Sequence, residues 1–307
     1  MTCPVPRSDS TPVDATTGTR HAVEQFENFG GSVFFAMFSL GLFDQTMLPA
    51  VSAALDATGR IREQPWGRAL RTAASDQLSL LGNDADRLAE AERLVRLHRD
   101  VKGVGHDGVR YSALAPESWN WILISTFFVH RGAYIALTGH TPTDAENQAV
   151  WDWFRDRLDA LQLPGRSRLT ADYAELARYY DDMVATKLTT TITTRDATAT
   201  VLRGPRPDFV PVVAAPLWRL AAPLISRVVV VLGCGIMHPG VRALMPVPWT
   251  RRHDREFRAL TALLRVAYRT LPRAVTDTPL ARNRRRYREL TAKYHATGLT
   301  SFAAEAR

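Results

Sequence analysis

The chain has 307 residues, of which 46% are hydrophobic and 23% are charged. This is an ordinary globular composition, and the length is ample for a full core in one large domain or two small ones. The formal net charge of +8 suits nucleic acid, an anionic membrane surface or an acidic ligand as a partner. With only two cysteines, Cys3 and Cys234, the chain offers neither a zinc site built on cysteines nor a disulfide framework.

The two ends of the chain differ from its middle. Residues 1–19 are rich in Pro, Ser, Thr and Asp, so we expect a disordered N-terminal tail. Residues 20–298 then form one helical domain, and residues 299–307 a frayed C-terminal tail. The first twenty-five residues contain no apolar segment of the kind found in secretory signals, so we expect a cytoplasmic protein.

The first apolar region, residues 34–43, predicts a buried helix, or two helices that meet near Asp44. It is too short and too interrupted by glycine for a membrane span. Phe35, Met37 and Phe38 either line a cofactor or substrate pocket or belong to the plain core. For each residue taken alone, the plain core is favoured. Helix continues over residues 45–58, with Pro49 at a kink or a first turn.

Two helices are predicted between residues 61 and 103. Pro65 begins the first, and Gly82-Asn83-Asp84 ends it and caps the second. Arg68 and Thr72 are four residues apart and therefore share a face. His98 belongs to an apolar stripe formed by Leu88, Ala91, Leu94, Val95, His98 and Val101. From periodicity alone, a histidine there is more often a satisfied core residue than a metal ligand.

Helices are also predicted over residues 117–138, 145–161, 171–188 and 195–202. The third and fourth of them are assigned Thr170 and Thr194 as N-caps, and the second a capping box of Thr143 with Glu146. His130 lies in the middle of the first. Periodicity does not separate it from His98 as an iron ligand.

The second apolar region, residues 210–237, contains three prolines together with Arg219 and Arg227. These residues argue against a bilayer span but allow a face that lies on a membrane. Residues 228–231 are all valine and favour a strand locally, but a helical context overrides this propensity. Helices over residues 254–271 and 278–296 complete the chain. The basic run Arg282–Arg288 predicts a solvated helix face.

The periodic segments together predict an all-α protein of about ten helices, without a convincing sheet. The sequence contains no dinucleotide-binding glycine motif after a strand, no P-loop and no nucleophile elbow. It also lacks the His-Glu-x-x-His of zinc peptidases and the carboxylate ligands of a di-iron bundle.

Four short motifs follow one another at characteristic spacing: Pro49-Ala50-Val51, Arg68-x-x-x-Thr72, His98-x-x-Val101-x-Gly103 and Tyr111-x-Ala113. Together they resemble the signature of the MpaB-type oxygenase family, which shares its catalytic domain with the rubber-cleaving latex-clearing proteins. The resemblance extends roughly from Phe29 to Arg282. It implies an all-helical protein that holds one b-type haem.

The resemblance also implies roles for single residues. His98 corresponds to the proximal iron ligand, and Arg68 and Thr72 to residues near the distal side of the haem. Many relatives carry a histidine directly before the Pro-Ala-Val segment, where this chain has Leu48, so the pocket is expected to be more apolar here. Arg68 or Arg71 is expected to pair with the haem propionates, and Phe38 to contact the cofactor.

The sequence therefore predicts a haem b-dependent oxygenase that uses dioxygen on an apolar or amphipathic small molecule. In such a site Arg68 would donate a hydrogen bond to reduced oxygen, and Thr72 would relay a proton. Cleavage of a carbon–carbon double bond is the reaction that the family implies. The alternative is a non-catalytic helical protein that binds a lipid or a partner helix, with possible peripheral membrane contact. Nucleic-acid binding through Arg282–Arg288 lacks any recognised module and is not expected.

Overall fold

The computed structural model describes residues 12–59, 63–106, 108–163 and 168–298. In this part of the chain, regular strands occur in one hairpin of β1 (Lys102–Val104) and β2 (Arg110–Ser112), which pair antiparallel. The rest of the regular structure is helical, which confirms the predicted all-α class.

The helices between the N-terminus and β1 are α1 (Pro12–Gly30), the 3₁₀ helix η1 (Val33–Met47), α2 (Pro49–Thr58), α4 (Pro65–Leu81) and α5 (Asp84–His98). Those that follow β2 are α6 (Pro116–Thr138), α7 (Asp144–Arg157), η2 (Asp159–Leu161), α8 (Tyr173–Thr186), α9 (Ile192–Arg203), η3 (Val212–Ala214), α10 (Ala215–Ile236), α11 (Pro239–Leu244), α12 (Arg251–Thr270), α13 (Arg273–Thr276) and α14 (Pro279–Thr297).

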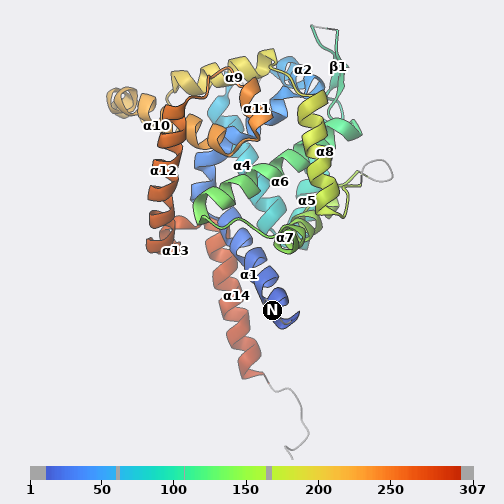
Figure 1. The fold of residues 1–307 in the computed structure, drawn as a ribbon, viewed down its shortest axis with the longest axis vertical. Coiled ribbons are helices and arrows are strands. Elements are labelled where there is room, and N and C mark those ends of the chain that lie inside the picture. The colour runs from blue at the N-terminus through green and yellow to red at the C-terminus, as the bar shows by residue number, and fades with distance from the viewer. Residues whose placement is uncertain (1–11, 60–62, 107, 164–167, 299–307) are drawn as a thin grey trace, which may run out of the picture.

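Helix α6 runs through the centre of the fold, with other helices on all sides of it in Figure 1. Its side chains Trp121, Phe127 and Tyr134 are completely buried. Phe127 contacts the rings of Phe26 from α1 and Trp151 from α7, with centroids 6.3 and 4.9 Å apart. These aromatic side chains join three helices into one core, because each buries a large apolar area.

Helix η1 packs between α6 and α10. It contains the whole first apolar region in one continuous helix. The boundary with the next helix falls at Leu48, not near Asp44. A 3₁₀ helix has 3.0 residues per turn, and the buried residues Phe38, Gly41, Asp44 and Met47 recur at that interval. The three-residue spacing therefore places four buried residues on one face.

Helix α10 confirms that helical packing overrides the strand propensity of its four valines, since Val230 and Val231 are buried inside it. By length and composition alone, Pro116–Thr138 and Val212–Ile236 are long and apolar enough to cross a membrane. Val33–Met47 and Pro49–Thr58 add a third candidate if this pair, bent by 107°, is counted as one span. Helix α6 uses its apolar side chains in the core, whereas α10 does so only in its second half.

Several sequence-based boundaries are corrected by the structure. Residues 12–19, predicted to be disordered, form the first turns of α1, because the helix propagates back from the buried Ala22 and Phe26. Residues 1–11 and the predicted C-terminal tail, 299–307, lie outside the described residues. Asp172, not Thr170, caps α8, and Thr191, not Thr194, caps α9.

The C-terminal helix α14 lies beside α1, and the two extend together from the body of the molecule (Figure 1). Arg284 and Arg288 of α14 form ion pairs with Glu27 of α1, at 3.7 and 3.1 Å. The segment before α14 is tied to the end of α1, because the Thr278 amide donates to the Gly31 carbonyl at 2.8 Å. The first and last described helices, α1 and α14, are therefore joined by ion pairs and by the segment before α14.

Candidate functional site

Helices α4 and α5 form the hairpin that carries the predicted site residues. Asn83 caps α5 in a box with Asp86, as its position after Gly82 predicted. Seven residues from the connecting turn along each helix, the Ser75 hydroxyl donates to the buried carboxylate of Glu90 at 2.5 Å. Both helices rise about 1.5 Å per residue, so Arg68 and His98 lie roughly 10–12 Å beyond this bond, toward the same end of the hairpin.

Toward the far end of this hairpin, both helices have aromatic contacts. Trp66 of α4 contacts Phe209 and Trp218, with ring centroids 6.2 and 6.1 Å away, whereas His98 of α5 contacts Trp119 of α6 at 5.6 Å. Between Trp66 and Ser75, a full turn of α4 is exposed, although it includes apolar side chains. The exposed residues are Ala69, Leu70, Arg71, Thr72, Ala73 and Ala74.

The His98 side chain has a defined orientation. It is partly exposed, and its Nδ1 lies 2.8 Å from the Leu94 carbonyl. A carbonyl only accepts, so Nδ1 carries the proton and Nε2 keeps its lone pair. Donation from the second ring nitrogen to a backbone carbonyl is the usual support of a ligating histidine. The stripe predicted for α5 is only partly confirmed, because Leu88 is 54% exposed.

Helix α4 carries Arg68, Thr72 and Arg71 in its first half, away from the turn that joins it to α5. Arg68 is partly buried, and Thr72 and Arg71 are exposed. The guanidinium of Arg71 folds back along its own helix, within 3.2 Å of the position that a Cβ on Gly67 would take. The structure thus places these three residues on α4 and His98 on the neighbouring helix α5.

Asp76 is a candidate residue that the sequence analysis missed. It follows Thr72 by four residues and Arg68 by eight, so the three residues form one row along α4. Its side chain is partly buried, and desolvation raises the pKa of this carboxyl to about 7. A carboxyl with such a pKa can hold and return a proton near neutral pH. The i, i+4, i+8 spacing of these three residues is the sequence pattern from which Asp76 could have been predicted.

His130 and Phe38 lie deeper in the core than the α4–α5 hairpin. His130 is 1% exposed and stacks on Phe35, with centroids 3.8 Å apart. Its Nδ1 lies 2.8 Å from the Thr126 carbonyl, and burial lowers its pKa to about 4, which keeps the ring neutral. Phe38 is fully buried in η1. Leu48 is 3% exposed, so the position held by histidine in many relatives is part of the apolar core here.

Asp44 forms a second buried polar cluster. The Ser125 hydroxyl donates to one carboxylate oxygen at 2.6 Å, and the Tyr180 hydroxyl donates to the other at 3.1 Å. Burial raises the pKa of Asp44 to about 7, against the opposing effect of these hydrogen bonds. The Tyr180 ring stacks on Trp121 at 5.3 Å. The cluster links η1, α6 and α8 in the interior and is closed to a large ligand.

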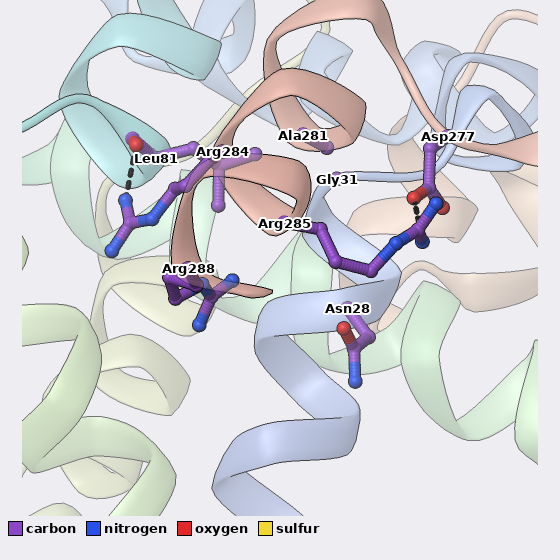
Figure 2. Close-up of a pocket in the computed structure, with 8 residues that line it drawn as sticks. All are labelled: Asn28, Gly31, Leu81, Asp277, Ala281, Arg284, Arg285 and Arg288. Atoms are coloured by element: carbon purple, nitrogen blue, oxygen red, sulfur yellow. Dashed lines mark hydrogen bonds and ion pairs between the residues drawn. The ribbon is translucent and has the colours of Figure 1, made fainter. Parts of the chain in front are cut away.

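Figure 2 shows a small pocket among the arginines of α14. Arg284 donates to the Leu81 carbonyl and Arg285 pairs with Asp277. The cavity volume is about 20 Å³, which holds about one water molecule and no phosphate. The prediction of a solvated face for Arg282–Arg288 is thus wrong for these two residues. They are partly buried and fix α14 to α4 and to the segment before it.

In the described part of the chain, no three His, Cys, Asp or Glu side chains converge to hold a metal ion. A haem needs no such cluster, because the porphyrin supplies four ligands and the protein one or two. The oriented imidazole of His98, the arginines of α4 and the apolar exposed turn are compatible with that requirement. The free cysteine Cys234 is buried, and burial raises its pKa to about 12, so it is an inert thiol.

Comparison with known protein families gives a match over most of the chain. Residues 28–266 match the model of a family described as the catalytic domain of ER-bound oxygenase mpaB/B' and rubber oxygenase. The match covers the hairpin, the central helix α6, α10 and most of α12. Neither the curated proteins nor the solved structures contain a match to the chain.

Proposed function

Since the chain belongs to the family of MpaB-type and rubber oxygenase catalytic domains, we propose that it is a haem b-dependent oxygenase. It uses dioxygen to oxidise an apolar or amphipathic organic metabolite. Oxidative cleavage of a carbon–carbon double bond is the reaction we propose first, by extension from the rubber oxygenases that the family name includes. The expected cytoplasmic setting remains part of this proposal.

The orientation of His98 carries the proposal. Its Nδ1 donates to the Leu94 carbonyl at 2.8 Å, which fixes the ring and leaves Nε2 to bind iron. The same bond raises the basicity of the ligating nitrogen. Trp119 holds one side of the ring, with centroids 5.6 Å apart, so a ligand is restricted to the remaining open side. When bound, the haem would supply the iron at which dioxygen is activated.

The residues of α4 then have distinct tasks. Arg68 and Arg71 would pair with the propionates of a bound haem or donate hydrogen bonds to reduced oxygen. Thr72 would relay a proton through its hydroxyl, and Asp76, one turn further along the helix, would hold a proton near neutral pH. Leu70, Ala69 and Ala73 on the exposed turn supply apolar contacts for the substrate.

The test is an absorption spectrum of the purified protein, supplied with haem, before and after reduction. We expect a Soret band that is lost in His98→Gly and restored when free imidazole fills the space left by the side chain. His106→Ala is the matched control, because His106 is exposed next to the hairpin of β1 and β2 and should leave the spectrum unchanged.

Two results would contradict the proposal at different points. A wild-type protein that binds no haem would refute the cofactor and therefore the reaction. A Soret band that persists in His98→Gly would move the ligand elsewhere. His130 would then be tested next, because its Nδ1 also lies against a carbonyl of its own helix and its Nε2 therefore keeps a lone pair.

A further inference from the structure

The start of α10 and the segment before it carry an unusual amount of exposed apolar surface. Val213, Leu217, Leu220 and Leu224 follow one another at i, i+4, i+7 and i+11 and are 90, 70, 81 and 69% exposed. Together with Phe209 and Val212, which are 64 and 74% exposed, we call them the α10 surface. Their exposed apolar area is on the order of several hundred Å², as large as the patches that mark interaction sites.

The opposite face of the first half of α10 is hydrogen-bonded to the rest of the protein, so the α10 surface faces outward. The Trp218 indole donates to the Gly204 carbonyl at 2.9 Å, and the Ser226 hydroxyl donates to the Val201 carbonyl at 2.7 Å. Ala222 is buried between them. Figure 1 shows the beginning of α10 projecting from the body of the molecule, beyond α12.

Basic residues outnumber acidic ones around the α10 surface. Between Phe209 and His253 the chain contains five arginines and no aspartate or glutamate, whereas Asp208 is exposed at one edge and Glu256 forms ion pairs with Arg227 and Arg252. Arg219 is exposed within the first half of α10, and Arg251 and Arg252 are exposed at the start of α12. Apolar side chains flanked by arginines match the acyl and headgroup layers of an anionic leaflet. We propose that the α10 surface docks the protein onto an anionic membrane.

The packing of α10 decides how deeply it enters the membrane. Its second half is buried, with Val231 and Leu232 at 0% exposure, and a Cβ on Gly233 would meet Leu40 of η1 at 2.6 Å. This half therefore stays in the protein, and the helix does not span the bilayer. A second copy of the chain is a poorer partner, because pairing this face with itself would set arginine against arginine.

The α10 surface also borders the candidate site. Trp66, two residues before Arg68, donates through its indole to the Pro205 carbonyl at 2.8 Å, and its ring contacts Phe209. On the basis of the proposed function, an apolar substrate dissolved in the membrane would meet the protein beside the exposed turn of α4. This point rests on that proposal, whereas the docking itself does not.

The experiment is flotation of the full-length protein with vesicles of phosphatidylcholine mixed with phosphatidylglycerol, and with vesicles of phosphatidylcholine alone. We expect the wild type to float with the anionic vesicles and less with the neutral ones. In the double variant Leu220→Gln, Leu224→Gln the partition coefficient should fall about tenfold or more, since each leucine removes several CH₂ groups from water. Arg219→Gln should weaken the preference for anionic vesicles.

The matched control is the double variant Val104→Gln, Val275→Gln. These valines are 62 and 63% exposed but lie in β1 and α13, outside the α10 surface. They should leave the partition coefficient unchanged. Flotation of Leu220→Gln, Leu224→Gln at the wild-type level would overturn the proposal, and so would a wild type that stays with neither vesicle. A dimer that these substitutions convert to a monomer, without vesicle binding, would assign the surface to a second copy.

Each measurement is made with and without added haem. Binding to vesicles without a Soret band would refute the proposed oxygenase and leave the docking surface intact. A Soret band without binding to vesicles would do the reverse. Thermal unfolding of each variant, followed by circular dichroism, verifies that these exposed substitutions leave the fold in place.

Discussion

The buried carboxyl of Asp44 makes the stability of this protein depend on pH in a way that one substitution removes. Asp44 is 1% exposed, and burial raises its pKa from 3.8 to about 7. In the unfolded chain the group ionises near its ordinary pKa, whereas in the folded protein it stays protonated until near neutrality. Between these two values the unfolded state therefore binds fewer protons, and the free energy of unfolding falls as the pH rises.

The size of the effect follows from the shift. A difference of about three pKa units corresponds to about 4 kcal/mol over the whole range. Between about pH 5 and about pH 8, the wild type should lose roughly 2 to 3 kcal/mol through this group. Asp44→Asn keeps the shape and an acceptor for Ser125 but has no proton to lose. The variant should therefore become more stable relative to the wild type as the pH rises.

The assay is urea unfolding of both proteins at several pH values, followed by circular dichroism. The difference between the two proteins isolates Asp44 from Asp76, which titrates in the same range. Ser125→Ala is an internal check, because the Ser125 hydroxyl lowers the pKa of Asp44. Its removal should raise that pKa further and steepen the loss. A constant difference between wild type and Asp44→Asn across this range would refute the reasoning.

Three further predictions test packing, capping and proton transfer. Gly233→Ala should lower the free energy of unfolding by about 1–3 kcal/mol, because its Cβ would overlap Leu40. Gly18→Ala, where no atom lies within 4 Å, should instead stabilise α1 by up to about 1 kcal/mol; urea unfolding measures both. Asn83→Ala should cost about 1 kcal/mol in the same assay, through loss of the α5 cap. If Asp76 donates a proton, turnover should fall as the pH rises through about 7, and Asp76→Asn should remove this dependence.

The helical hairpin was predictable because its signals are local. Pro65 at the start of α4 and Asn83 after Gly82 act on the turn in which they stand, and both helices begin where predicted. Helix α5 ends earlier than predicted, at His98, and Val101 lies outside it. The N-caps of α8 and α9 were harder to predict, because several neighbouring polar residues could each cap the helix. Thr170 donates instead to the Glu175 carboxylate at 2.5 Å, and Thr194 is buried against Thr46 at 2.8 Å.

The tertiary contacts were the part that local patterns do not contain. The close packing of η1 uses Gly41, which α6 and α10 approach, and Gly233 of α10, which lies against Leu40. The partners of Arg284 and Arg285 come from α4 and from the segment before α14. Their positive charge predicted a solvated face, but the fold supplies a carbonyl and a carboxylate to them. Local patterns therefore do not contain the packing partners, and the roles given to the site residues stay predictions.

The exposure of α4 and of α10 has different physical causes, and the difference bears on function. The exposed turn of α4 includes Thr72 and Arg71. It lies between Trp66, which packs on the α10 region, and Ser75, which donates to Glu90 of α5. An exposed turn held on both sides suits a ligand that covers it. The α10 surface has contacts on one face only, and this suits a partner of large extent. Trp66 contacts Phe209 of the α10 surface and stands two residues before Arg68, so the two exposed regions are adjacent.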